Sequence, residues 1–464
     1  MLVRLVLIAL SLLLVTAFAA CRGGGDSSDS GTATPTSTES PTTSPTATPD
    51  SGDGEIGATP LQIGEEVGIP EDVALIIELG CTQCDGPTEG LARVYRDSSG
   101  QIRIDTLFDP DEMGLPPRVV ADPKAETGTR EEEPFINGFA LSSDASEIIV
   151  SVCTRGGCVE PLSSPTPDSE TTLFRSSDGG VTWEQFTTLD GVHLVAALAQ
   201  GDVVLLKLIQ DESSQEYQRE YILLSSGDSI APPQAASGSP VALPDSALIW
   251  PTDSGRVVRS DGGVLATLPE GAQIAGITPN STGDRIAIVW YREQTGQQVT
   301  YRLTITSLDG STINTFPLDG FARVGGWLDD NRLVGNTSVT SEQLTTQPPV
   351  SGGAFFVGYL PAILDLAAAR IHPITQPFFE QRFLNGRNHV LAAVQGPFAR
   401  IVNTDSCLNI RAQPGTSAEV LTCLADGVLL RDGGDTQEAD GMTWLRVTAP
   451  GGVEGWASTD YLER

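Results

Sequence analysis

The sequence predicts an all-β protein built from short antiparallel hairpins. Its clearest hairpin is 174–186 (FRSSDGGVTWEQF), where an apolar run ends in a Ser-Ser-Asp-Gly-Gly turn and alternation resumes after it. Similar short strands recur between residues 73 and 394, with no amphipathic helix among them. The chain also has 49 glycines and 31 prolines against 6% aromatic residues, a composition typical of turn-rich β-proteins.

The hairpins alternate between two kinds, which we interpret as the inner and outer strand pairs of repeated four-stranded units. Inner hairpins are predicted at 135–153, 192–209, 241–250, 272–291, 321–335 and 377–395. Outer hairpins are predicted at 91–108, 171–189, 220–232, 255–268, 300–317 and 354–374. Their spacing of about 45–60 residues is that of β-propeller blades.

The first hairpin of this series is an outer one and the last is an inner one. We therefore expect 73–108 to join 377–395 in a single blade, which closes the ring and removes exposed sheet edges. This predicts a six-bladed propeller over 60–396, with seven blades as the alternative.

The turn of the 174–186 hairpin also carries a recognisable motif. Ser176, Asp178, Gly180, Thr182 and Trp183 fit the Asp-box of sialidases and related propellers, position by position. The inner hairpins at 140–152 and 276–290 resemble the repeats of TolB-type propellers. The Asp-box resemblance implies a structural role, in which the Ser and Asp side chains bond turn amides and the Trp packs between blades.

The N-terminus resembles a bacterial lipoprotein signal. Residues 1–20 contain Arg4 and an apolar run too short to favour a permanent membrane span, followed by Phe-Ala-Ala-Cys, which is similar to the lipobox. The resemblance implies that Cys21 carries a lipid and anchors the protein outside the cytoplasm, in the cell membrane. An ordinary signal peptidase site after Ala20 is the alternative. Residues 21–59 are rich in Ser, Thr, Pro and Gly, which predicts a disordered tether.

Residues 399–464 are predicted to form a separate small β-barrel. The run 408–415 (LNIRAQPG) and the later Trp444, Trp456 and Tyr461 resemble bacterial SH3-like domains in order and spacing. We expect these three aromatic residues to lie in the barrel core, with contact to a ligand as the alternative. The resemblance implies binding of a cell-wall peptide, peptidoglycan or a protein partner.

Six cysteines besides Cys21 predict disulfides, since the chain is expected to be exported. The candidates are Cys81, Cys84, Cys153, Cys158, Cys407 and Cys423, with Cys407–Cys423 the best-supported pair. The first four could pair locally, pair across blades or form a four-thiolate zinc site. We expect disulfides here, and no metal or cofactor.

The charge and the longest loops bear on function. The net charge of −33, with 60 acidic and 27 basic residues, argues against nucleic-acid binding.

The insertions 109–134, 159–170 and 210–219 are predicted to gather on one face of the ring, either as a binding surface or as tolerated loops. We further expect the barrel to leave the ring on that face and the tether to arrive on the opposite one. A ligand would then be held between the barrel and the propeller loops.

These features predict a lipid-anchored extracytoplasmic binding or scaffold protein with no catalytic residues. The alternative is a sialidase-like or other glycoside-processing enzyme. Glu216-Tyr217 is the one adjacent pair that suggests such a site, and the early Phe/Tyr-Arg-Ile-Pro motif of sialidases is absent.

Overall fold

Strand pairing assembles the chain into six sheets and a C-terminal barrel. The computed structural model describes residues 61–65, 67–81, 89–97, 99–121, 124, 127–142, 144–155, 169–197, 201–210, 217–292, 300–318, 321–340, 356–374 and 386–464. The predicted signal sequence, Cys21 and the predicted tether lie outside the described residues. Within the described part, no helix combines the length and apolarity needed to cross a membrane.

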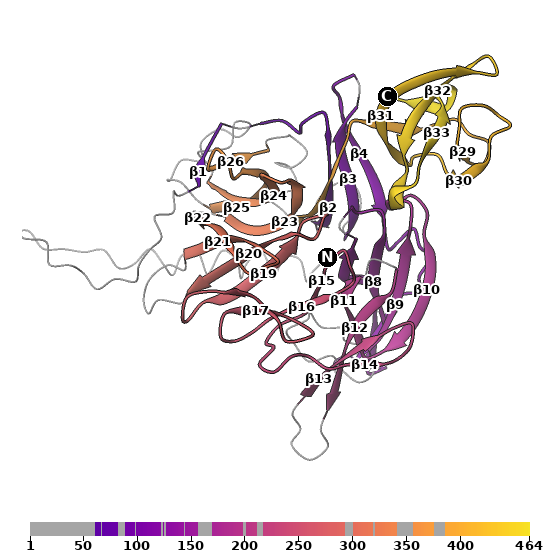
Figure 1. The fold of residues 1–464 in the computed structure, drawn as a ribbon. Coiled ribbons are helices and arrows are strands. Elements are labelled where there is room, and N and C mark those ends of the chain that lie inside the picture. Colours follow the sequence, from indigo (N-terminus) through magenta and orange to yellow (C-terminus); the bar gives the residue numbers. More distant parts are fainter. Residues whose placement is uncertain are drawn as a thin grey trace, which may run out of the picture. The chain divides into compact units, whose positions relative to one another are not determined.

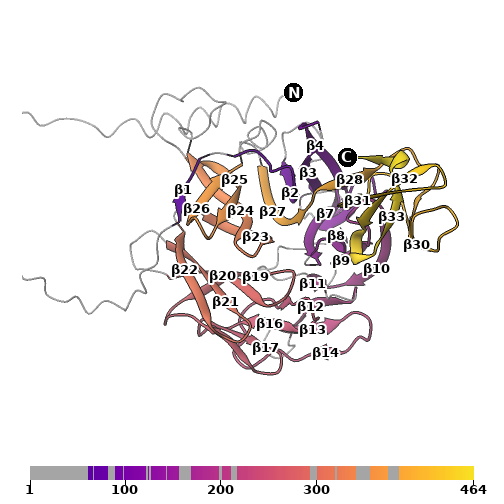
Figure 2. The ribbon, with the colours of Figure 1, turned by 45° about the horizontal axis from the view of Figure 1, so that its top comes forward.

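Each of the six sheets contains four antiparallel strands ordered from the inside to the outside of the ring, and the sixth sheet carries β1 (Gln62–Ile63) as a fifth strand at its outer edge (Figures 1 and 2). Blade 1 consists of β27 (Gly386–Gln395), β2 (Val73–Cys81), β3 (Glu89–Arg96) and β4 (Ile102–Phe108). Blade 2 consists of β7 (Phe135–Leu141), β8 (Ile148–Arg155), β9 (Glu170–Ser176) and β10 (Glu184–Asp190). Blade 3 consists of β11 (Val192–Ala197), β12 (Val203–Gln210), β13 (Tyr217–Leu223) and β14 (Ser229–Ile230).

The remaining blades repeat this pattern. Blade 4 consists of β15 (Val241–Ala242), β16 (Leu248–Pro251), β17 (Arg256–Arg259) and β18 (Val264–Thr267). Blade 5 consists of β19 (Gln273–Pro279), β20 (Arg285–Arg292), β21 (Thr300–Ser307) and β22 (Thr312–Leu318). Blade 6 consists of β23 (Phe321–Asp329), β24 (Arg332–Thr340), β25 (Phe356–Asp365) and β26 (Arg370–Pro373). The predicted six-bladed propeller is confirmed.

The core lies between blades, where side chains on alternate positions of a strand contact different neighbours. In β8, Ile148, Val150 and Val152 pack against blade 1, whereas Ile149 packs against blade 3. Successive side chains of a strand point to opposite faces, so a strand that is covered on both faces is apolar at most positions. This explains the apolar run Ile148–Val150 in β8.

Blade 1 is closed by strands from both ends of the propeller, as expected. Strand β2 pairs with β27 in antiparallel register, with Val73 opposite Gln395. The predicted hairpin at 377–395 contributes the single strand β27, while 375–385 lies outside the described residues.

The predicted placement of the barrel is wrong. An innermost strand runs toward the face that holds the short turns 97–101, 142–147 and 177–183, which we call the turn face. The strand ends at Phe108, Arg155 and Gln210, from which the three insertions start, lie on the opposite face. A complete hairpin would have returned the chain to that insertion face. Because β27 is the innermost strand of blade 1 and Gln395 lies opposite Val73, the chain enters the barrel from the turn face.

The N-terminal part of the described chain covers one blade edge. Strand β1 (Gln62–Ile63) pairs in parallel with β26, and Leu61 is buried in the core between blades 5 and 6. A further hairpin, β5 (Arg118–Ala121) with β6 (Thr129–Glu132), forms within the 109–134 insertion.

The barrel contains seven strands and two short 3-10 turns. They are β28 (Phe398–Ile401), β29 (Leu408–Arg411), β30 (Val420–Leu424), β31 (Leu429–Ala439), β32 (Met442–Thr448), β33 (Glu454–Ser458) and β34 (Leu462–Glu463), with η2 (Pro450–Gly452) and η3 (Thr459–Tyr461). Barrel and propeller belong to one compact unit, Glu55–Arg464.

Candidate functional site

The Asp-box turn lies on the turn face and is closed by one carboxylate. Asp178 accepts hydrogen bonds from the N–H groups of Val181 (3.0 Å) and Thr182 (2.9 Å), and from the hydroxyls of Thr182 (2.6 Å) and Ser176 (2.8 Å). Gly180 has a φ of +91°, a conformation that favours glycine. Both oxygens of Asp178 therefore have partners within the turn.

Trp183 connects this turn to the preceding blade. Its indole N–H donates to the carbonyl of Leu107 at 2.6 Å, and its ring meets that of Phe108 edge-on, with centroids 4.8 Å apart. Both contacted residues belong to β4 of blade 1. These contacts give the motif a structural role in the interface between blades 1 and 2.

Aspartates close most other turns on this face in the same way. Asp97 accepts the N–H groups of Ser99 and Gln101, and Asp309 accepts the N–H of Ser311. Hydrogen bonds from the Ser99 and Ser307 hydroxyls are the largest cause that lowers the pKa of Asp97 and of Asp309, respectively, to about 2. Burial would raise the pKa of Asp144, but bonds from the Ser142 and Ser146 hydroxyls and the Ser146 N–H lower it overall.

The barrel contacts blade 1 through a buried arginine. Arg93, on β3, is 4% exposed. Its guanidinium donates to Asp105 on β4 (2.7 Å) and to the backbone carbonyl of Gly427 in the barrel (2.9 Å). Arg400, on β28, lies 3.8 Å from the same carboxylate. Asp105 is thus placed between two arginines, one from each part of the chain.

Blade 2 also contacts the barrel, through the Asp-box turn. Val181 packs against the apolar core of the barrel. A Cβ added at Gly427 would lie 3.6 Å from the Val181 side chain. Turn and barrel are therefore in van der Waals contact. We call these contacts of Arg93, Asp105, Val181, Arg400 and Gly427 the junction.

A cavity of ≈ 300 Å³ lies on the turn face, lined by turns of blades 2 and 4 and by one residue of the barrel. The propeller contributes Ser142, Asp144, Glu147, Arg175 and Ser177 to its lining, and the barrel contributes Gly451. Arg175 and Glu147 form an ion pair of 2.6 Å in its wall. The lining therefore offers hydroxyls, one paired guanidinium and a net negative charge to a ligand.

Residues 406–463 match the family model of the bacterial SH3 domain. The barrel is a bacterial SH3 domain. No curated protein matches the chain.

Several solved structures resemble the chain at low identity. TolB from Acinetobacter baumannii is 16% identical, with a TM-score of 0.38 over 69% of this chain and 65% of that chain. An oligogalacturonate lyase from Vibrio parahaemolyticus is 12% identical, with a TM-score of 0.34 over 66% of this chain and 79% of that chain. The β-propeller domain of the Trilobed protease from Pyrococcus furiosus is 9% identical, with a TM-score of 0.31 over 71% of this chain and 96% of that chain. The fold assignment rests on the strand pairing described above.

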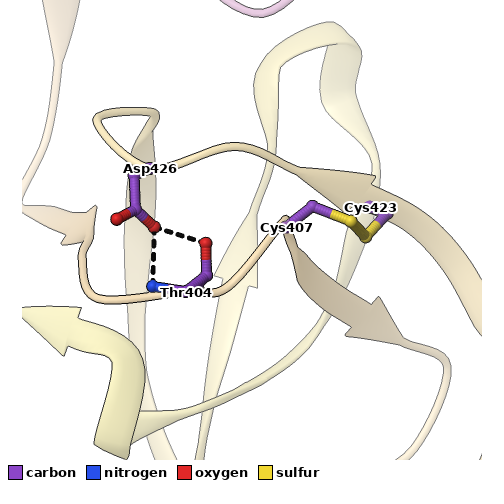
Figure 3. Close-up of a disulfide and its surroundings, with 4 residues drawn as sticks. All are labelled: Thr404, Cys407, Cys423 and Asp426. Carbon is purple, nitrogen blue, oxygen red and sulfur yellow. Dashed lines mark hydrogen bonds between the residues drawn. A yellow bond between two sulfur atoms is a disulfide. The ribbon is translucent and has the colours of Figure 1, made fainter.

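The SH3 domain contains the expected disulfide. Cys407 and Cys423 are bonded, with Cα atoms 5.5 Å apart, and they join the start of β29 to β30 (Figure 3). Nearby, Asp426 accepts the N–H of Thr404 at 2.9 Å and its hydroxyl as well. The Thr404 hydroxyl is the largest cause that lowers the pKa of Asp426. The segment 404–407 is thus held at both of its ends.

The three aromatic residues of the SH3 domain differ in burial. Trp444 is buried, as expected, and its indole N–H donates to the carbonyl of Ala439. Trp456 is only half-buried. The expectation for Tyr461 is wrong, because its side chain is 40% exposed at the end of the short turn η3.

The other predicted site residues are described only in part. Cys153 is disulfide-bonded, which removes one of the four thiolates that a zinc site would need. Cys84, Cys158, Glu216 and the side chains of Cys81 and Tyr217 lie outside the described residues. In the part of the chain that is described, no three His, Cys, Asp or Glu side chains form a group that could hold a metal ion.

The junction was missed by the sequence analysis. Arg93 follows Leu91 at the spacing of residues that share a face of one strand, and Leu91 is fully buried against blade 2. A charged residue on such an apolar face is a signal for a buried partner. The partner itself, 334 residues away, has no local signal in the sequence.

Proposed function

We propose that this protein is a non-catalytic binding or scaffold protein, held at the outer side of a cell membrane through a lipid on Cys21. The observation that carries the binding role is the cavity, whose wall is built jointly by propeller turns and by Gly451 of the SH3 domain. Ligand sites commonly form where two folded parts meet. The anchor rests on the lipobox-like Phe-Ala-Ala-Cys sequence and the polar tether that follows it.

The lining favours a polar ligand that is neutral or cationic. The guanidinium of Arg175 is already paired with Glu147, so the Asp144 carboxylate leaves the wall negative. The net charge of −33 acts in the same direction and disfavours polyanions such as nucleic acids. A cell-wall peptide or glycan, or a segment of an envelope protein, meets these requirements, and no cofactor is invoked.

Two features support a non-catalytic role over the sialidase-like alternative. The Asp-box carboxylate has hydrogen-bond partners for both oxygens within its own turn. The Arg175 guanidinium, the arginine in the cavity wall, is engaged by Glu147. A carboxylate substrate would need a free arginine clamp, together with a nucleophile and an acid.

The test is co-sedimentation of the Cys21→Ser chain with purified peptidoglycan, alongside a pull-down from envelope extract. We expect Ser177→Trp to abolish the interaction, because the indole would fill the cavity from an exposed turn position. Ser229→Trp, the same change at an exposed site on β14, serves as the control and should bind normally. Normal binding by Ser177→Trp, or hydrolysis of a glycoside by the unmodified chain, would contradict the proposal.

A further inference from the structure

Blade 1 is the place where the ring can open. Its inner strand β27 and the neighbouring β2 come from opposite ends of the propeller, and they are joined by their ladder of backbone hydrogen bonds and by a shared core that includes Leu75 and Val390. Every other blade is a continuous stretch of chain from its first strand to its last, except that β1, from the N-terminal side, pairs with β26 at the edge of blade 6. Opening the ring therefore means separating β27 from β2 and releasing β1 from β26.

The SH3 domain belongs to one side of this closure. It follows β27 directly, since Gln395 ends β27 and Phe398 begins β28. Strands β3 and β4 belong to the other side, because they continue from β2. Any contact of the SH3 domain with β3 or β4 therefore also joins these two sides, in addition to the β2–β27 and β1–β26 pairings.

The junction makes such contacts, and the Arg93 side chain among them is shielded from water. Arg93 on β3 donates to Gly427 of the SH3 domain, and Asp105 on β4 faces Arg400 of β28. The Arg93 side chain is 5% exposed and that of Asp105 is 19% exposed, so the charges are only weakly screened. Separating the two sides would leave Arg93 without its carbonyl partner and uncover apolar surface at Val181.

We infer that the SH3 domain stabilises the closed propeller. Its surface around Arg400 and Gly427 is occupied by blades 1 and 2 of the same chain, and these contacts keep blade 1 closed. Propeller and SH3 domain should then unfold as one cooperative unit. That surface is not available to an outside partner, whereas Val420 and Leu421, on β30, remain 44% and 42% exposed. The inference does not depend on the ligand proposed above.

The test compares variants of the Cys21→Ser chain by calorimetry and by hydrogen exchange with mass spectrometry. The parent chain should show a single unfolding transition. In Arg93→Met we expect two transitions and at least tenfold faster exchange of the β2 and β27 amides. Blade 4 shares no core cluster with blade 1, so its amides should be unaffected. Glu463→Gln removes only an exposed ion pair with Arg103 at the rim, and it should behave like the parent.

Two results would overturn the inference. One is a pair of independent transitions in the parent chain, and the other is unchanged β2 and β27 exchange in Arg93→Met. Val181→Ala keeps the backbone N–H that closes the Asp-box turn and removes only packing on the SH3 domain. If Arg93→Met does not fold, Val181→Ala must show faster β2 and β27 exchange, and normal exchange in it would also overturn the inference.

Discussion

The carbonyl of Leu107 accepts the indole N–H of Trp183 at 2.6 Å, so the outermost strand of one blade is bonded to the Asp-box hairpin of the next. The approach is close, since a Cβ on Gly180 would lie only 3.0 Å from Leu107. The Asp-box thus acts at an interface between blades as well as within its own turn. This predicts that its residues matter for the stability of the ring.

Trp183→Phe should lower the free energy of unfolding by about 1–3 kcal/mol, the usual effect of leaving a buried carbonyl without its donor. The phenyl ring would keep the contact with Phe108 but could not donate to Leu107 or Gly180. Urea unfolding followed by circular dichroism measures the change. A variant as stable as the parent would show that the indole hydrogen bonds contribute nothing.

Asp178→Ala should cost about 1–3 kcal/mol of stability, because it leaves turn N–H groups of a buried site without an acceptor. It should leave binding to peptidoglycan or to an envelope partner unchanged. Asp261→Ala is the matched control, since Asp261 is exposed and accepts only the N–H of Gly263 among the contacts of its turn. Lost binding at an unchanged melting temperature would mean that Asp178 belongs to a ligand site.

Replacing Cys407 and Cys423 by Ser should lower the stability of the SH3 domain by about 3 kcal/mol, the cost of releasing a loop of this size. Thermal unfolding with and without reductant measures it. Intact-mass analysis of the Cys21→Ser chain after alkylation should find no free thiol. Stoichiometric zinc in the purified protein would contradict the disulfide assignment of Cys81, Cys84, Cys153 and Cys158.

The turn carboxylates predict loss of stability in acid. The pKa of Asp97 and of Asp309 is lowered from 3.8 to about 2 in the folded chain. The unfolded chain therefore binds more protons in this window, and the stabilisation is complete above about pH 4 and lost as the pH falls toward 2. The melting temperatures of the parent and Asp309→Asn should differ at pH 6 and converge near pH 2.5. A difference independent of pH would contradict this cause.

Cys21→Ser should move the protein from the membrane fraction to the soluble fraction, because the lipid would have no sulfur to attach to. Fractionation and immunoblotting of cells that express each form measure this. A control Ser27→Ala, in the tether, should remain with the membrane. Retention of the Cys21→Ser chain in the lipid fraction would rule out the anchor.

The blades could be predicted because their signals are local. Apolar runs such as Ile148–Val150 follow from burial between two blades, and turns that contain an aspartate mark many of the places where a hairpin reverses. The face from which the chain enters the SH3 domain could not be predicted in this way. That face depends on whether one or two strands of the last blade precede Gly396. Antiparallel strands alternate in direction, so one strand more or less places the end of the chain on the opposite face.

The site depended on contacts that no local pattern encodes. Arg93 and Gly427 meet only because the chain closes its ring at blade 1. The cavity likewise joins turns of two blades to a loop of the SH3 domain. Such groupings follow from the tertiary arrangement, and residue spacing alone does not reveal them.

The aspartate-closed turns change what the acidic composition means. A carboxylate that already accepts backbone N–H groups has fewer lone pairs to offer a passing cation, and its low pKa keeps it charged in weak acid. Some of the 60 acidic residues, including Asp97 and Asp309, are therefore a by-product of how hairpins on the turn face are terminated. Counter-ion titrations should accordingly report fewer free anionic groups than the composition suggests, while mutual repulsion between molecules keeps the protein dispersed.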